Sequence, residues 1–390
     1  MRSGVAEAVD PEAVIACLQE LVQINSVNPF LVPGAPGEAE MAAAIGRRME
    51  AIGLTPCTID VAPGRPNLLA RMPGSGGGKT LILNAHMDTV GVAGMTIPPF
   101  EPVIRDGSLY GRGSADTKAG LAAEIVAIET VRRAGIPLRG DVILAAVADE
   151  EYSSLGSAHL ARTERADGCI IAEDTALRLM VAHQGFAWYE IEVIGRAAHG
   201  MFPDQGIDAI AGMGKVLAAL DQLDREVLSK NVHPLAGRCV FHNGTIHGGA
   251  EPGIYPARCA LQIEIGCNPG ETIAQRRGEI DTILAQLSAE DSRFQSNVIT
   301  HIERSPFEGD PDAAVVRTLG QCVQAETGSP YQLIGENAWM DAALLQEAGI
   351  PTVVFGPRGG GFHADVEWVE VDQVVSAARI LAETIVRFCA

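Results

Sequence analysis

Short apolar runs alternate with longer amphipathic stretches along most of the chain. Helices are predicted where apolar residues recur every three or four positions, at residues 11–24, 39–52, 118–133 and 372–388. Strands are predicted where apolar residues run together, at residues 68–71, 81–85, 142–148, 169–172 and 352–355. The alternation of such strands with helices is typical of an α/β fold.

The middle of the chain has a different pattern. Residues 188–193 and 260–265 alternate between apolar and polar side chains, as in antiparallel strands with one exposed face. Residues 207–220 and 272–287 have helical spacing. We therefore expect residues 183–304 to form an inserted α+β domain, and residues 1–182 and 305–390 to form the two parts of one α/β domain.

The glycine-rich segment at residues 73–80, PGSGGGKT, is similar to a phosphate-binding loop in its last residues. That loop requires a glycine where this chain has Pro73, and it leads into a helix, whereas residues 81–85 are predicted to form a strand. We therefore interpret the segment as a flexible hairpin turn between strands 68–71 and 81–85.

The composition indicates a globular protein and limits the kinds of partner that it can bind. A chain of 390 residues that is 47% hydrophobic and only 20% charged can bury a large core and form two or three domains. It has 29 Lys and Arg against 49 Asp and Glu, which gives a formal net charge of −20. This balance argues against a nucleic-acid partner and against an anionic membrane surface, because both require a basic footprint.

The cysteines and the apolar runs indicate the compartment. Eight cysteines are spread along the chain without a C-x-x-C pair, which is typical of buried free thiols rather than of a disulfide framework. No apolar run reaches the roughly 18 residues of a membrane span, and the first residues carry no apolar stretch of the signal-peptide kind. We therefore expect a cytoplasmic protein with no membrane partner.

Potential metal ligands occur where several predicted strands and helices begin or end. The five places are His86 with Asp88, Asp116, Glu150 with Glu151, Glu173, and His363 after a glycine-rich turn. Each of them alone has an ordinary structural explanation, such as a solvated helix start. In open α/β sheets, however, ligands bind at the carboxyl ends of the strands, so the joint pattern predicts one site.

The residue types at these places favour a catalytic metal site. Two imidazoles and several carboxylates without a thiolate are typical of zinc or a similar divalent ion. In the H-x-D segment, Asp88 can accept the imidazole N–H of His86 and fix its orientation. Glu150 and Glu151 cannot both bind one metal with the same geometry, so one of them is free to act as a general base.

Six segments resemble, in order, the motifs of the di-zinc aminoacylase family, which includes acetylornithine deacetylase, succinyl-diaminopimelate desuccinylase, carboxypeptidase G and related dipeptidases. They are HMDTV, GRGSADTKAG, ADEEYSSLGS, IIAEDTALRL, GRAAHGMFPDQGIDAI and GPRGGGFHADVEWV. The resemblance implies a three-layer α/β/α zinc-hydrolase catalytic domain with an inserted α+β lid domain through which the chain forms a homodimer.

The resemblance also implies a role for each site residue. Two zinc ions, for which cobalt or manganese can substitute, would share Asp116 as a bridging ligand. His86 and Glu173 would complete one metal, with Asp174 as the alternative to Glu173, and Glu151 and His363 would complete the other. Glu150 would activate the metal-bridging water, Asp88 would orient His86, and His199 in the lid would bind the oxyanion.

The implied function is metal-dependent hydrolysis of an amide bond in an N-acyl amino acid or a small peptide, as in a deacetylase or desuccinylase. A dipeptidase or carboxypeptidase of the same family is the alternative. A non-catalytic binding protein is less favoured because neither the base nor a ligand is lost, and a serine hydrolase lacks its G-x-S-x-G turn.

The chain departs from the family at the substrate carboxylate. Many relatives hold it with an Asn and an Arg thirteen residues apart, and the matching positions here are Gly253 and Gly266. The usual clamp is therefore expected to be absent. Arg258 and Arg358 are the candidate replacements, although each is equally consistent with a surface arginine.

Overall fold

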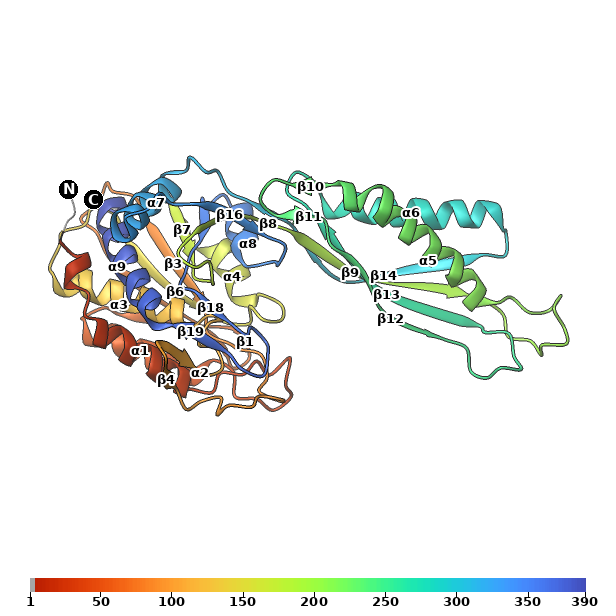
Figure 1. The fold of residues 1–390 in the computed structure, drawn as a ribbon, viewed down its shortest axis with the longest axis horizontal. Helices are drawn as coiled ribbons and strands as arrows, with labels where there is room; N and C mark the ends of the chain where they lie inside the picture. Colours follow the sequence, from red (N-terminus) through yellow and green to blue (C-terminus); the bar gives the residue numbers. More distant parts are fainter. Residues whose placement is uncertain (1–3) are drawn as a thin grey trace. The chain divides into compact units, whose positions relative to one another are not determined.

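The computed structural model describes residues 4–390, which divide into two compact units (Figure 1). Unit 1 holds the described residues up to Val181 together with Gly309–Ile334 and Met340–Ala390. Unit 2 holds Ala182–Glu308 and Gly335–Trp339. Among the residues described, no helix combines the length and the apolar character that a membrane span requires.

Unit 1 is built on a large mixed sheet. Its strands are β1 (Pro56–Ala62), β2 (Arg65–Met72), β3 (Leu81–His86), β6 (Val142–Val147), β7 (Gly168–Ile171), β8 (Leu179–His183), β16 (Leu333–Glu336) and β17 (Thr352–Val354). The short β15 (Phe307–Glu308) pairs with Ala182 and His183, the last two residues of β8. The order is β1-β2-β6-β3-β7-β17-β8-β15, and β16 pairs with β8. The neighbouring strands β6, β3, β7 and β17 are parallel, so their carboxyl ends lie at the same edge of the sheet.

Helices cover this sheet and bury it. They are α1 (Pro11–Gln23), α2 (Ala39–Ala51), α3 (Lys118–Arg133), α4 (Leu155–Thr163), α7 (Ala314–Thr327), α8 (Ala342–Glu347) and α9 (Val371–Phe388), together with the short η1 (Ala6–Ala8). A smaller sheet has the order β18-β19-β5-β4, from Gly359–Gly360, Trp368–Glu370, Ser108–Tyr110 and Val103–Arg105.

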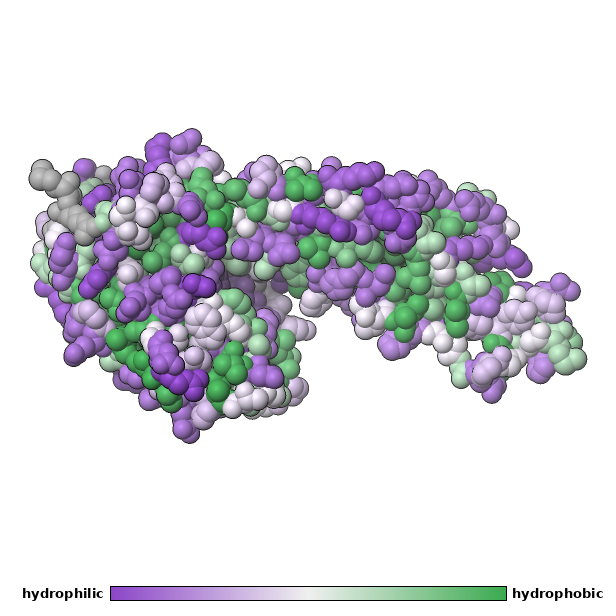
Figure 2. All heavy atoms as spheres, in the orientation of Figure 1, coloured by the Kyte–Doolittle hydropathy of each residue, from purple (hydrophilic) through white to green (hydrophobic). Residues whose placement is uncertain are grey.

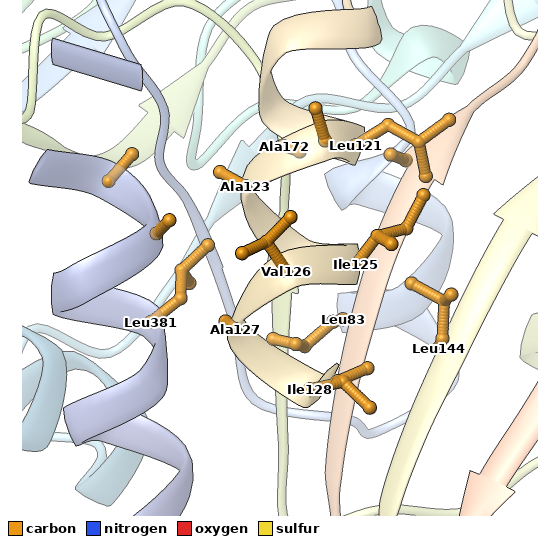
Figure 3. Close-up of a cluster of buried hydrophobic side chains, with 14 of the residues drawn as sticks. Leu83, Leu121, Ala123, Ile125, Val126, Ala127, Ile128, Leu144, Ala172 and Leu381 are labelled. Carbon is orange, nitrogen blue, oxygen red and sulfur yellow. The ribbon is translucent and has the colours of Figure 1, made fainter. Parts of the chain in front are cut away.

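Helix α3 lies at the centre of the core of unit 1 (Figure 3). Leu121, Ile125 and Ile128 of α3 lie on the side of Leu83 and Leu144 in the sheet. On the other side of the helix, Ala123, Val126 and Ala127 face Leu381 of α9. Every residue of α3 from Lys118 to Val131 is buried, so this helix and the turn before it are held rigidly against the sheet.

The prediction of a hairpin between β2 and β3 is wrong. Strand β6 lies between them, antiparallel to β2 and parallel to β3. Residues 73–80 therefore cross over β6, and the N–H of Gly74 donates to the Asp141 carboxylate, which precedes β6, at 2.9 Å. A glycine-rich segment marks a turn in the chain, but it carries no information on which strands pair beyond it.

Unit 2 contains an antiparallel sheet of order β12-β13-β9-β14, from Phe241–Gly248, Arg258–Cys267, Gly185–Ile194 and Gln295–Arg304. Strands β9 and β13 alternate as the sequence predicts, and their inward side chains, such as Tyr189, Ile191 and Ile263, form the core of this unit. Strands β12 and β14 were not predicted.

Two helices, α5 (Ala209–Glu226) and α6 (Ile273–Glu290), pack on the same sheet of unit 2. Asp208 caps α5, and Thr272 and Gln275 form a capping box at α6. Hydrophilic side chains cover most of the surface over α6 in Figure 2, as an amphipathic surface helix requires. The short elements η2 (Leu228–Lys230), β10 (Val232–His233) and β11 (Gly237–Arg238) complete the unit.

Candidate metal centre

The parallel strands of unit 1 bring the predicted ligands together. His86 is the last residue of β3, Glu150 and Glu151 follow β6, and Glu173 follows β7. Because these strands are neighbours in the order β6-β3-β7, the three loops leave the sheet side by side. Asp116 enters from the turn before α3, and His363 from the turn after β18.

Asp116 stands between the two histidines. Its Oδ1 lies 3.0 Å from Nε2 of His86, and its Oδ2 lies 3.3 Å from Nε2 of His363. Glu173 Oε1 is 3.5 Å from the same nitrogen of His86, and Glu151 Oε2 is 3.0 Å from that of His363. Two groups of three residues therefore share one carboxylate.

This donor set fits divalent metal ions. Ligand atoms of His86, Asp116 and Glu151 all lie within 4.8 Å of one another. Imidazole nitrogens and carboxylate oxygens are ligands for zinc and for neighbouring first-row metals, and a carboxylate with one oxygen toward each histidine suits a shared ligand.

The carboxylates and imidazoles of the cluster shift one another's pKa values. The carboxylates of Asp116 and Glu151 raise the pKa of His363 to about 10. Burial, reinforced by the charge of Asp116, raises the pKa of Glu151 to about 7, and burial raises that of Glu173 well above its usual range. Burial alone would also raise the pKa of Asp116, but the two imidazoles together hold it low. The buried acids therefore require cations.

Glu150 has a different environment from its neighbour Glu151. Its main-chain N–H donates to Asp88 Oδ1 at 3.1 Å, which fixes the backbone at the start of the turn. Burial raises the pKa of its carboxyl well above the usual value, and the nearby carboxylate of Asp341 adds to the effect. A carboxyl group with a raised pKa beside a cluster of candidate metal ligands is suited to take up and return a proton.

Asp88 contacts His86 mainly through its backbone. Nδ1 of His86 lies 2.9 Å from the carbonyl oxygen of Asp88 and 3.7 Å from its carboxylate. The carboxylate instead accepts hydrogen bonds from the N–H groups of Glu150 and Glu151 and from the side-chain amide of Asn28. The carbonyl thus orients the imidazole, and the carboxylate holds the loop after β6.

Glu367 is a residue of the site that sequence reasoning missed. Its Oε1 accepts the N–H groups of Ala115 and Asp116 at 2.9 and 3.1 Å, and its Oε2 accepts Arg112 at 2.6 Å. Arg112 in turn donates to the carbonyl of Ala364, next to His363, at 3.1 Å. These bonds tie the Asp116 turn to the His363 turn. The signal in the sequence was its place in the segment GPRGGGFHADVEWV, four residues after His363.

The geometry favours Glu173 over Asp174 as the metal ligand. The Asp174 carboxylate accepts the N–H of Gly359 and so holds the turn after β17, whereas Glu173 faces His86. The neighbouring candidate Arg358 has a side chain that is 58% exposed, and its Nη1 lies 3.3 Å from Glu370.

His199 lies in unit 2, in the exposed turn between β9 and α5. Its Nδ1 accepts the N–H of Met201 at 3.2 Å, and its ring lies 6.1 Å from that of Phe202. The backbone of this turn is joined to the predicted clamp segment, since the N–H of Gly200 donates to the carbonyl of Gly253 at 2.9 Å. The catalytic role of His199 stays a prediction.

The two glycines at the clamp positions differ in their surroundings. A Cβ at Gly266 would lie 2.9 Å from Gln184 Oε1 and from the backbone of Val240, so an arginine there would require the backbone to shift. A Cβ at Gly253 would meet nothing within 4 Å. The candidate replacement Arg258 lies on the exposed face of the sheet and donates to Glu192 at 2.7 Å and to Glu190 at 2.8 Å. Its charge is thus already balanced.

The chain is similar to known proteins over most of its length. The family model for peptidase family M20/M25/M40 matches residues 82–387. Acetylornithine deacetylase of Edwardsiella ictaluri is 31% identical over 83% of each chain. N-formyl-4-amino-5-aminomethyl-2-methylpyrimidine deformylase of Bacillus subtilis is 27% identical over 95% of each chain.

Solved structures share the fold. Aminopeptidase PepT from Bacillus cereus superposes with a TM-score of 0.83 at 22% identity, over 98% of this chain and 100% of that one. The YXEP protein of Bacillus subtilis, described as a dinuclear metal binding peptidase, has a TM-score of 0.73 at 15% identity, over 97% and 98% of the two chains.

Proposed function

This chain belongs to the peptidase family M20/M25/M40, and from that premise we propose how its residues act. It is a metallo-amidohydrolase, which hydrolyses the amide bond of an acyl amino acid or a peptide. The observation that carries the proposal is Asp116, with one carboxylate oxygen toward His86 and the other toward His363.

We propose that Asp116 is shared by two divalent metal ions. His86 and Glu173 would complete the ligands of one ion, and Glu151 and His363 those of the other. The absence of a thiolate and the mixture of imidazole and carboxylate favour zinc, with cobalt or manganese as substitutes. When bound, such ions polarise the substrate carbonyl and make water a better nucleophile near neutral pH.

Glu150 would move the proton in this reaction. Its carboxylate accepts a proton from the attacking water, and it returns that proton to the amide nitrogen as the carbon–nitrogen bond breaks. The burial that raises its pKa makes it a stronger base and stabilises the protonated form between the two transfers. His199 would donate a hydrogen bond to the oxyanion that forms on the carbonyl.

The substrate class depends on the clamp positions. A deacetylase or desuccinylase of N-acyl amino acids is our first candidate, and a dipeptidase or carboxypeptidase is the alternative. Gly253 and Gly266 favour a further candidate, a deacylase whose amine product has no carboxylate. The deformylase relative, whose name specifies an aminomethylpyrimidine, has such a product.

We propose that the chain forms a homodimer through unit 2. Strand β12 is at the end of its sheet and is largely exposed, so its outer N–H and C=O groups are available to a second strand. Ile246 on β12 and Ile210 on α5 are 50% and 48% exposed and would be covered in a symmetric contact. Light scattering should give twice the 41.0 kDa of one chain, and Ile246→Lys should shift the mass toward the monomer.

We also propose that the protein works in the cytoplasm. All eight cysteines are unpaired, and all but Cys57 are buried. Buried thiols without disulfide partners are typical of a reducing compartment. Thiol titration of the purified unfolded chain should find eight free thiols without prior reduction.

Metal content and a substrate panel test the proposed function. We expect about two zinc ions per chain, loss of activity on chelation and recovery with zinc or cobalt. The panel should contain N-acetyl and N-succinyl amino acids, dipeptides and N-formyl amines. Asp116→Asn should lower both the metal content and the activity, whereas full activity in that variant or in chelated protein would contradict the proposal.

A further inference from the structure

A buried polar network lies behind the turn that carries Glu150. Its members come from five separate parts of unit 1: Asn28, Glu38, Arg65, Asp88 and Asp149. Arg65 is 3% exposed, and the other four are fully buried. Three carboxylates thus share one guanidinium and one amide away from solvent, which is costly unless their hydrogen bonds are made.

Asn28 joins two loops of the metal centre. Its Nδ2 lies 2.7 Å from Asp88 Oδ2 and 2.9 Å from Asp149 Oδ1, so both amide hydrogens bind carboxylates. Its own N–H donates to the carbonyl of Thr89 at 2.9 Å. One side chain therefore connects the loop after β3, which follows His86, to the loop after β6, which carries Glu150.

Arg65 supplies the charge that this connection needs. It donates from Nε to Glu38 at 2.6 Å and from Nη2 to Asp149 Oδ1 at 3.1 Å. Its guanidinium also lies 4.8 Å from the ring centre of Phe30, two residues after Asn28. Asp149 thus has a cation on one side and the Asn28 amide on the other.

Asp149 determines the direction of the backbone just before Glu150. Its φ of +71° lies in the left-handed region of backbone conformation, which residues other than glycine rarely adopt. Its carboxylate also accepts the hydroxyl of Ser153, and its carbonyl accepts the N–H of Ser153 at 3.2 Å. The side chain is therefore held at both oxygens while the backbone turns, and the next residue is the proposed base.

We propose that Asn28, Arg65 and Asp149 are positioning residues that hold the Glu150 carboxylate in its working position beside the metal ligands. The inference rests on the proposed function of Glu150. None of the three contacts the reacting atoms in this role. They act through the left-handed turn at Asp149, whose hydrogen bonds they supply.

The test compares Asn28→Ala with Asn268→Ala in the metal-loaded full chain. Asn268 is an equally buried asparagine of unit 2 whose amide donates to the carbonyls of Asn231 and Gly237, so its loss removes two hydrogen bonds without touching these loops. For Asn28→Ala we expect kcat to fall about 10- to 100-fold, with KM within about twofold and the metal content kept, because a small displacement of a catalytic group is costly. For Asn268→Ala we expect a lower Tm and an unchanged kcat.

Conservative variants at Asp149 complete the experiment. Asp149→Asn keeps an oxygen that can accept from Arg65, so its kcat should stay within about fivefold of the wild type. Asp149→Gly keeps the left-handed backbone but loses the side-chain hydrogen bonds, so its kcat should fall about as far as that of Asn28→Ala. An unchanged kcat in Asn28→Ala and Asp149→Gly, or an equal fall in Asn268→Ala, would overturn the inference. A wild-type chain that binds no metal and cleaves no amide would overturn the proposed function instead.

Discussion

The two units hold their candidate functional groups in opposite ways. In unit 1, His86 and the acids are largely buried near the carboxyl edge of a parallel sheet, and His363, with a side chain that is 56% exposed, joins them from the turn after β18. Side chains such as Asn28 and Glu367 fix the loops that carry the buried groups. In unit 2, His199 and Arg258 lie on exposed surfaces. His199 accepts a hydrogen bond from Met201 in its own turn, and Arg258 donates to Glu190 and Glu192 on the paired strand β9. A buried charge requires its partners, so the metal centre depends on the fold, whereas exposed groups change at little cost to stability.

The largest expected effect is at the proposed base. Glu150→Gln should lower kcat by about 10³- to 10⁴-fold, because it removes the group that moves the proton. The metal content should stay near that of the wild type, since Glu150 is not among the proposed ligands. The comparison requires kcat and metal analysis on the same preparation.

The matched control for Glu150 is on the exposed sheet face of unit 2. Glu264 of β13 accepts the indole N–H of Trp188, and Glu264→Gln keeps an oxygen for that bond. Its kcat should stay within about twofold of the wild type. If both variants lost activity equally, the assignment of Glu150 as base would be wrong.

An intermediate effect is expected for the exposed histidine. His199→Ala should lower kcat about 10²-fold if it removes one hydrogen bond to the oxyanion. Tm and metal content should change little, because the contacts of the ring with the N–H of Met201 and the ring of Phe202 lie within its own exposed turn. The same truncation at His301 on β14, whose side chain is 42% exposed, is the control, and its kinetics should match the wild type.

The residues of the candidate metal centre could be predicted from the sequence because the proposed ligands follow local patterns. His86 and Glu173 end or follow an apolar run, Glu151 follows the run 142–148 after Asp149 and Glu150, and parallel strands place such residues at one edge. The secondary structure followed from the same patterns, and α3 was predicted with the bounds that the structure has.

The residues that join the loops could not be predicted in this way. Asn28 and Glu367 lie 60 or more residues from the loop residues that they join. Asn28 belongs to none of the motifs, and the motif that contains Glu367 does not indicate which residues it binds. The hairpin prediction at residues 73–80 failed for the same reason, because β6 comes from a later part of the chain. Long-range pairing depends on the whole tertiary structure, which hydrophobic spacing does not encode.

A further prediction concerns Glu124, a buried acid whose carboxyl group has no hydrogen-bond partner among the described residues. Glu124 lies in the middle of α3, and neither carboxylate oxygen has a hydrogen-bond partner among residues 4–390. Burial raises the pKa of its carboxyl well above the usual value, so the folded state holds a proton that the unfolded state loses as the pH rises. Stability should therefore decrease with pH above the usual range of a glutamate, and Glu124→Gln should remove this decrease.

We expect Glu124→Gln to raise the free energy of unfolding relative to the wild type at pH 8 and to differ least near pH 4, where the folded and unfolded wild type both hold the proton. Chemical unfolding of both metal-loaded proteins at the two pH values measures this difference. Glu129→Gln on the same helix is the control, because Glu129 is buried but paired with Arg48 at 3.0 Å, and its loss should destabilise the protein. A higher free energy of unfolding in both variants would contradict the explanation that the missing partners of Glu124 cause the effect.

The smallest effect is expected at Arg258, and it tests the substrate role predicted for this residue. The guanidinium is bound to Glu190 and Glu192 on an exposed sheet face, and solvent screens such pairs. Arg258→Gln should change Tm by no more than a few degrees and leave kcat/KM within about twofold on every substrate of the panel. If Arg258 instead binds the substrate carboxylate, KM would rise at least about tenfold for N-acyl amino acids and stay unchanged for N-formyl amines. That difference would show that an exposed ion pair opens on substrate binding, so the exposed surface of unit 2 would carry specificity while the buried loops of unit 1 carry the chemistry.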